Sequence, residues 1–130
     1  MPWVEVFAVF LVCHLAGDYL LQTDWQATNK PGGLGPDPEA RRALARHIGS
    51  YTLAFVPAFA WLASEIGVLL VPVVALVALP HWIQDDGRLL HLYIRKVKGC
   101  DAAANPAVTG AADQSFHIVA LLAVALLAGG

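Results

Sequence analysis

Four blocks of apolar residues dominate the chain, separated by two polar connections and one short polar break. The blocks lie at about residues 3–22, 48–64, 66–84 and 107–128. Each approaches the roughly 20 residues that a helix needs to cross the hydrocarbon layer of a membrane. None shows the alternation of apolar and polar residues that is typical of a barrel strand. The pattern therefore predicts an all-α protein, in which residues 1–130 form a single membrane domain, a bundle of four transmembrane helices.

The second and third blocks are separated by polarity only at Ser64 and Glu65, and Gly67 favours a turn there. We expect these two blocks to form a tight helical hairpin. Transmembrane helices tolerate prolines where neighbouring helices satisfy the freed carbonyl groups. The hairpin contains three such residues, Pro57, Pro72 and Pro80.

The two polar connections contain signals of their own. In the first, Asp37 is placed to cap a helix that has Pro38 at its first position, which predicts a short amphipathic helix through Arg46 between spans 1 and 2. The second, residues 86–106, begins as a basic amphipathic continuation of the third helix. It ends at Asn105 and Pro106, a cap and start for the fourth helix.

Positive charge indicates the orientation of the four spans. All Lys and Arg residues lie in the two polar connections: Lys30, Arg41, Arg42, Arg46, Arg88, Arg95, Lys96 and Lys98. With four spans, both connections lie on one side of the membrane. The positive-inside rule makes that side cytoplasmic, so both termini and the hairpin at Glu65 are expected outside.

Composition supports a membrane protein and argues against other classes. The chain is 58% hydrophobic and only 14% charged, whereas about a quarter of the residues in soluble domains are charged. The net charge of −2 gives no electrostatic basis for binding nucleic acid. Cys13 and Cys100 form no disulfide framework. The first block lacks a basic segment before it and a cleavage site behind it, so we expect a retained helix rather than a signal peptide.

Histidine and aspartate recur four residues apart in three of the blocks, as HLAGD, HWIQD and DQSFH. Residues four apart share a helix face. In the predicted topology the three pairs reach one depth, in the cytoplasmic half, where His47 opens the second span. Gln22 and Tyr51 continue two of these faces. The resulting set of candidate metal ligands is His14, Asp18, His47, His81, Asp85, Asp113 and His117.

A single His/Asp pair is explained by a hydrogen bond that holds a bundle together, but three pairs and a further histidine exceed what packing needs. Imidazole suits zinc and other transition ions, and carboxylate suits harder ones, so we expect a divalent metal, with zinc the first choice. Seven ligands are more than one tetrahedral ion takes. Either two ions share a carboxylate, or some residues orient ligands or act as a base, with Asp18 and Asp113 the candidates. A metal-free polar network and a proton or ion pathway are the alternatives.

The same motifs resemble a known family. HLAGDYLLQTDWQATNK, a histidine that opens the second span, HWIQD and DQSFH resemble the small bacterial and phage membrane proteins of the domain of unknown function 3307 family. The resemblance implies a bacterial inner-membrane protein with these residues as its polar core, and it implies no reaction. More distantly, the arrangement is similar to membrane-bound metal-dependent hydrolases.

The segment QTDWQATNK has two interpretations. In one, Asp24 caps a helix and Trp25 anchors it at the membrane interface. In the other, a binding rim for a phosphate headgroup is formed by Gln22, Asn29, Lys30 and Arg88. Two further residues are expected at the surface, Asp86 in solvent and His91 on the basic stretch.

The sequence thus favours a metal-dependent hydrolase of a phosphoester or another amphiphilic substrate at the cytoplasmic face, with Asp18 and Asp113 as catalytic candidates. Cation or proton transport or sensing is the first alternative, and its weakness is the almost purely apolar external half. A non-catalytic membrane scaffold is the second. The expected partners are the lipid bilayer and an amphiphilic or phosphate-containing substrate, and small residues on helix faces would permit a homodimer.

Overall fold

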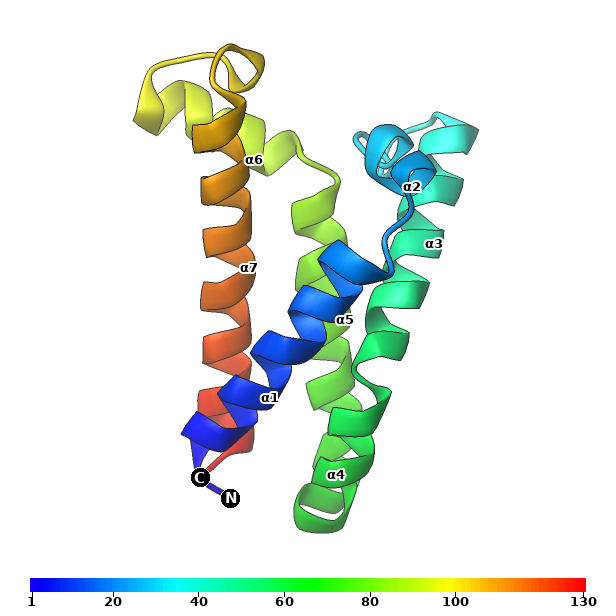
Figure 1. Cartoon of the computed structure of the whole chain (residues 1–130), viewed down its shortest axis with the longest axis vertical. Coiled ribbons are helices and arrows are strands. Elements are labelled where there is room, and N and C mark those ends of the chain that lie inside the picture. Colours follow the sequence, from blue (N-terminus) through cyan, green and yellow to red (C-terminus); the bar gives the residue numbers. More distant parts are fainter.

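The computed structural model describes residues 1–130, and every regular element in it is helical (Figure 1). The α-helices are α1 Trp3–Leu15, α2 Asp24–Asn29, α3 Pro38–Ala54, α4 Val56–Ile66, α5 Leu70–Asp85, α6 Arg88–Tyr93 and α7 Pro106–Ala128. The π-helical turns are η1 Ala16–Leu20 and η3 Ile94–Lys98, and the 3₁₀ turns are η2 Gly67–Leu69 and η4 Ala102–Ala104. Both termini lie at one end of the bundle, and both polar connections lie at the other (Figure 1). We call these the terminal end and the basic end.

Three helical stretches are long and apolar enough to cross a membrane: Trp3–Leu20, Val56–Asp85 and Pro106–Ala128. The all-α prediction is confirmed, whereas four separate spans are not clearly resolved. The second stretch contains the predicted reversal, because Gly67 has a φ of 54° and α4 and α5 run side by side in opposite directions (Figure 1). With 11 residues, α4 is about 16 Å long and cannot cross the hydrocarbon alone.

The short helix predicted between spans 1 and 2 is not a separate element. Its start is correct, because the Asp37 side chain accepts a hydrogen bond from the Glu39 N–H. The helix then continues past Arg46 to Ala54, since no glycine with unusual backbone geometry or proline interrupts it. It breaks at Phe55, because Pro57 has no N–H to bond the carbonyl four residues earlier. The predicted block at 48–64 therefore combines the end of α3 with α4.

The prediction that the basic stretch continues α5 is also wrong. Gly87 adopts a left-handed conformation with φ of 86°, which ends α5 and redirects the chain into α6. Figure 1 shows α6 lying across the basic end, beside the start of α7. The predicted cap of the last helix is confirmed, because the Asn105 side chain accepts from the Val108 N–H.

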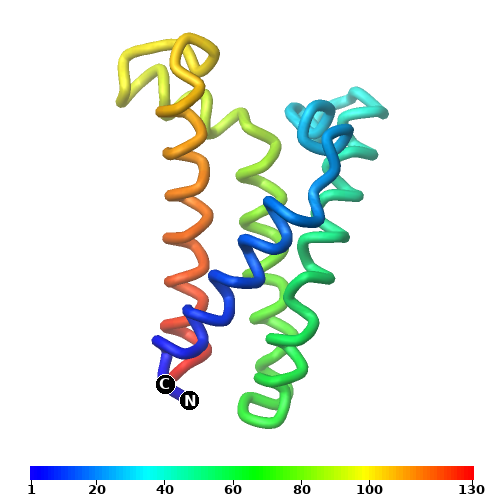
Figure 2. Tube along the Cα trace, viewed as in Figure 1, coloured from blue at the N-terminus to red at the C-terminus, as the bar shows by residue number.

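An apolar core fills the terminal half of the bundle. Figure 2 shows α1 starting beside the end of α7 and crossing the bundle obliquely toward α3. The ring of Phe10 packs edge to face on Phe55 and Phe59, and the last two rings stack on each other. All three belong to a cluster of 13 buried residues. The buried histidines and aspartates of η1 and of α1, α3, α5 and α7 lie in the other half, toward the basic end.

Candidate metal centre

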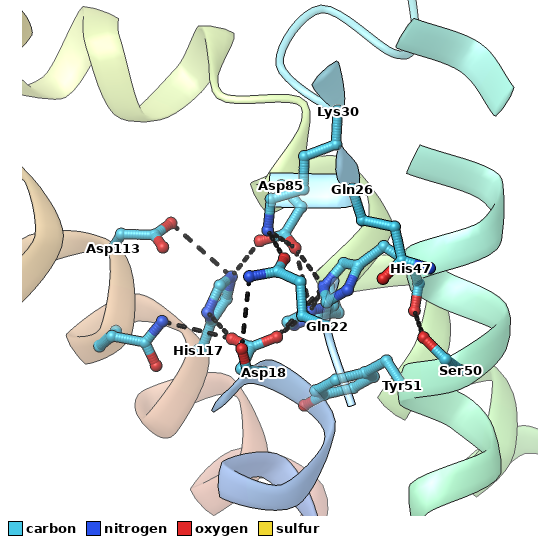
Figure 3. Close-up of polar contacts among 12 residues, drawn as sticks. Asp18, Gln22, Gln26, Lys30, His47, Ser50, Tyr51, Asp85, Asp113 and His117 are labelled. Carbon is cyan, nitrogen blue, oxygen red and sulfur yellow. Dashed lines mark hydrogen bonds and ion pairs between the residues drawn. The ribbon is translucent and has the colours of Figure 1, made fainter. Parts of the chain in front are cut away.

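The seven predicted ligands come together in the half of the bundle nearer the basic end. They form three overlapping groups, in each of which the candidate ligand atoms lie within 4.8 Å of one another. Six of the seven residues are buried, and Asp113 is 27% exposed. The side chains come from α1 and η1 (His14, Asp18), α3 (His47), α5 (His81, Asp85) and α7 (Asp113, His117). Figure 3 shows five of them, Asp18, His47, Asp85, Asp113 and His117, pointing toward one another.

Four of these atoms have the spacing of a tetrahedral ion site. The Nε2 atom of His47 lies 3.1 Å from Asp18 Oδ1 and 2.8 Å from Asp85 Oδ2. The Nε2 atom of His81 lies 3.1 Å from each of the same two oxygens, and 3.1 Å from His47 Nε2. Zinc–ligand bonds of 2.0–2.1 Å place tetrahedral ligand atoms about 3.3 Å apart. These four residues, which we call the closed group, therefore fit around one ion.

The polar atoms at the centre of the closed group also fit a cation. Asp18 Oδ1 is buried without a hydrogen-bond partner. The Nδ1 atoms of His47 and His81 also lack one, and a cation bound at Nε2 would leave them so. The two imidazoles instead direct their Nε2 atoms at each other and at two carboxylates. A neutral imidazole has its lone pair on the nitrogen that carries no proton, so each Nε2 offers one when the ring proton is on Nδ1. One central cation would accept these lone pairs together with those of the carboxylates.

A second group lies on the other side of Asp85. The Nε2 atom of His117 is 3.0 Å from Asp85 Oδ1 and 3.8 Å from Asp113 Oδ1. Asp85 thus faces the closed group with one oxygen and this open group, formed by Asp85, Asp113 and His117, with the other. A pocket of about 180 Å³ adjoins the open group and is lined by Lys30, Asp85 and Asp113, among others. Three protein ligands with an open side are typical of catalytic zinc sites.

His14 is held by protein groups on both of its ring nitrogens. The Tyr51 hydroxyl lies 2.9 Å from Nδ1, and Gln114 Oε1 lies 2.8 Å from Nε2. The Gln114 amide nitrogen donates to Asp18 Oδ2 at 3.3 Å, so Oε1 is the acceptor, and His14 carries its proton on Nε2. The chain of donors from Tyr51 to Asp18 therefore orients Asp18, with Oδ1 left for the closed group.

Gln114 is the residue of this site that sequence reasoning missed. It lies inside the DQSFH motif, three residues before His117 and hence on the same face of α7. That spacing is the signal that could have identified it.

Tyr51 and Gly17 position the ring of His81. The Tyr51 ring stacks on His81 with a centroid distance of 3.6 Å and an interplanar angle of 5°. The stack is close to α1, because a Cβ atom added at Gly17 would lie 2.6 Å from Tyr51 Cδ2. Gly17 lies in the π-helical turn η1, a distortion often found at functional sites. The glycine of HLAGD thus makes room for the tyrosine of α3.

The four predicted rim residues separate into two pairs. The Lys30 ammonium donates to Gln22 Oε1 at 2.6 Å and to Asp85 Oδ2 at 2.8 Å, so both residues reach the site (Figure 3). Asn29 instead donates to the Trp25 carbonyl in α2, and Arg88 pairs with Asp86. The chain thus brings one cation into direct contact with the metal-ligand candidates.

Two smaller predictions near the rim are wrong. The cap of α2 is Thr23, which forms a capping box with Gln26, whereas Asp24 is the first helical residue. Asp86 is only 4% exposed, because its carboxylate accepts from the Leu34 N–H at 2.8 Å and from Arg88 Nε at 2.7 Å. Burial raises the pKa of Asp86, but the hydrogen bonds from Arg88 and Leu34 outweigh it and hold the pKa below its usual value. Asp86 thereby fastens the α2–α3 loop to the end of α5.

The comparisons with known proteins give a family. The sequence model of a family described as "Protein of unknown function (DUF3307)" matches residues 6–129. Because the match covers almost the whole chain, the chain belongs to this family. Comparisons with curated proteins and with solved structures gave no match.

Proposed function

We propose that this DUF3307 protein is a membrane-embedded, metal-dependent hydrolase of a phosphoester or a similar amphiphilic substrate. The observation that carries the proposal is the pairing of two groups through Asp85. The closed group has tetrahedral spacing, and the open group has three ligands and adjoins a pocket. Burial of histidine and aspartate side chains with unpartnered nitrogen and oxygen atoms costs free energy at membrane depth. Such residues therefore usually have a function.

The proposal assigns two divalent ions, with zinc the first choice because histidines dominate. His47, His81, Asp18 and Asp85 would hold the first ion, and His117, Asp85 and Asp113 the second. A bound ion of this kind polarises the scissile oxygen and lowers the pKa of a water molecule toward about 7. His14 would serve through the orientation of Asp18, since both of its ring nitrogens already have partners.

The side chains of the open group have different tasks in this proposal. Asp113 is the member exposed to solvent, whereas Asp18 Oδ2 is occupied by the Gln114 amide. Asp113 is therefore the better placed of the two catalytic candidates to accept a proton from an attacking water. The Lys30 ammonium lies at the pocket wall, where it would bind a phosphate oxygen of the substrate.

Transport is the weaker proposal for the same residues. A transport path needs polar groups on both sides of the site. Here the terminal half beyond the site is filled by the apolar core, including Phe10, Phe55 and Phe59. The proposed hydrolase needs access from one side only. By the positive-inside rule, that side is the cytoplasm.

Metal content tests the first part of the proposal. The protein, purified in mild detergent, should contain about two divalent ions per chain by elemental analysis. A His81→Ala/Asp85→Asn double variant should lose them, while Glu65→Gln at the terminal end should keep them. Fewer than about 0.1 ion per chain in the wild type, unchanged in the double variant, would contradict metal binding.

Hydrolysis needs a separate test. Wild-type protein loaded with zinc should release phosphate from an alkyl phosphate, and a chelator should stop the reaction. Asp113→Asn should lower kcat by at least about 100-fold, the range for loss of a general base. Activity that survives both chelator and Asp113→Asn would rule out this mechanism.

A further inference from the structure

Three pockets form a row that starts at the open group and runs along α7. The first is the pocket of about 180 Å³ beside Asp113. The second, of about 200 Å³, shares Gln84, Leu90 and Asp113 with the first. The third, of about 460 Å³, shares Tyr93 and Phe116 with the second. Consecutive pockets have wall residues in common, so they adjoin one another along α6 and α7.

The character of the row changes along its length. The residues that line the first pocket are almost all charged, polar or small, and they include Lys30, Asp85 and Asp113. The second has leucine and aromatic walls, with Tyr93 and Phe116 packed edge to face at a centroid distance of 4.9 Å. The third is lined mostly by alanine, valine and the same aromatic pair. A ligand that matches this row is polar at one end and apolar at the other.

The apolar end of the row lies on an exposed, apolar face of α7. Phe116 and Val119 are exposed on α7, within a stretch that is long and apolar enough to cross a membrane. Lys98 lines the third pocket, and Arg95 lines a neighbouring pocket that shares Leu89 with the second. Asp85, Asp113 and Asp101 line the same pockets, so the row carries charge of both signs. An anionic group is complemented by Lys30 at the wall of the first pocket.

We propose that the substrate is a phosphate-bearing lipid that enters from the bilayer. Its phosphate lies between Lys30 and the open group, and its hydrocarbon chain passes Leu90 and the Tyr93–Phe116 pair to lie on α7. This inference rests on the proposed function, since it names the substrate of the same site. It adds that a water-soluble phosphoester lacks the part of the ligand that the second and third pockets recognise.

Binding in nanodiscs of phosphatidylcholine tests the inference without turnover. The probes are dodecyl phosphate and glycerol phosphate, with the dissociation constant measured for each. Ala111→Trp fills the third pocket from an exposed position, and Ala123→Trp is the matched control on an exposed position of α7 outside every pocket. Leu89→Trp, also at an exposed position, narrows the second pocket and guards against a folding defect in the first variant.

We expect wild type and Ala123→Trp to bind dodecyl phosphate more tightly than glycerol phosphate. Ala111→Trp and Leu89→Trp should each weaken dodecyl phosphate binding by roughly tenfold, the equivalent of about two unburied CH₂ groups. Their binding of glycerol phosphate should not change. The inference would be overturned if wild type bound both probes equally. It would also be overturned if Ala111→Trp and Leu89→Trp bound dodecyl phosphate like wild type.

The failure of this inference differs from failure of the proposed function. Suppose that the protein contains metal and hydrolyses glycerol phosphate in a chelator-sensitive way, and that Ala111→Trp binds dodecyl phosphate like wild type. The proposed hydrolase would then be supported and the lipid substrate contradicted. If the protein contained no metal but bound dodecyl phosphate more weakly after Ala111→Trp and Leu89→Trp, the lipid site would be supported and the proposed hydrolase contradicted.

Discussion

His47 on α3 and His81 on α5 direct their Nε2 atoms at each other across 3.1 Å, and both nitrogens face the same oxygens of Asp18 and Asp85. A hydrogen bond between the two imidazoles would use one proton and satisfy these two nitrogens only. A cation at the centre of the four atoms satisfies the Nε2 atoms and the carboxylates at once. A bound metal ion should therefore contribute to the stability of the fold.

Metal removal should destabilise the protein. Because the ligands come from η1, α3 and α5, a bound ion connects three helices and binds the folded state only. At a free zinc concentration 100 times the dissociation constant, binding contributes about 2.7 kcal/mol to the free energy of unfolding. Thermal unfolding in detergent, with and without a chelator, measures the difference. His47→Ala should abolish the chelator effect, and His91→Ala, in α6 outside the three groups, should preserve it.

His14 and His47 should differ in their effect on metal affinity. His47 is in direct contact with both carboxylates of the closed group, whereas His14 acts on Asp18 through Gln114. Loss of an orienting residue typically lowers metal affinity by 10–100-fold. We therefore expect His14→Ala and Gln114→Ala to weaken zinc binding to a similar extent, and His47→Ala to remove it. Zinc titration with a competing chelator measures all three, and equal loss in His14→Ala and His47→Ala would make His14 a ligand.

Sequence patterns predicted which residues meet, but not which atoms pair. Two of the intrahelical pairs, His14–Asp18 and Asp113–His117, have closest separations of 3.8 Å, and only His81–Asp85 is close, at 3.1 Å. The shortest contact, 2.8 Å, joins His47 and Asp85 on different helices. Helical periodicity places a side chain on a face, whereas pairing between helices depends on how far each helix is rotated and shifted. Asp18 also lies in the π-helical turn η1. The direction of its side chain therefore differs from that expected for an ideal α-helix.

The errors at the basic end have two kinds of cause. The continuous α3 and the redirection at Gly87 depend on the local backbone, whereas the burial of Asp86 depends on a contact between segments far apart in the chain. Polarity alone separates a loop from a span, so it assigned the polar part of α3 to a separate helix and Asp86 to solvent. The Asp86–Leu34 hydrogen bond joins residues 52 positions apart. Local signals such as the caps at Asp37 and Asn105 were correct because they depend on neighbouring residues only.

Lys30 should oppose metal binding and favour phosphate binding. Its ammonium donates to Asp85 Oδ2, the oxygen that faces the closed group, so it competes with a cation there and repels it. Lys30→Met should tighten zinc binding by about tenfold and weaken alkyl phosphate binding by a similar factor. Lys96→Met, an exposed cation outside every pocket, is the control. If zinc and phosphate affinity both fell in Lys30→Met, Lys30 would be a structural residue instead.

Gly17 should be essential for the geometry of the site. A methyl group at this position would lie 2.6 Å from Tyr51 Cδ2, closer than real Cβ contacts, so the tyrosine ring must move. That movement would disturb the stack on His81 and the hydrogen bond to His14 at once. We expect Gly17→Ala to lower the free energy of unfolding by about 1–3 kcal/mol, the range for overpacking a buried site.

Gly49 provides the matched control for this substitution. It lies in α3 on an exposed position, and a Cβ atom added there would have no neighbour within 4 Å. Gly49→Ala should therefore be neutral or stabilise the helix by up to about 1 kcal/mol. Thermal unfolding and zinc titration of the two variants separate helix propensity from site geometry. Wild-type zinc affinity in Gly17→Ala would show that the Tyr51–His81 stack does not position the closed group.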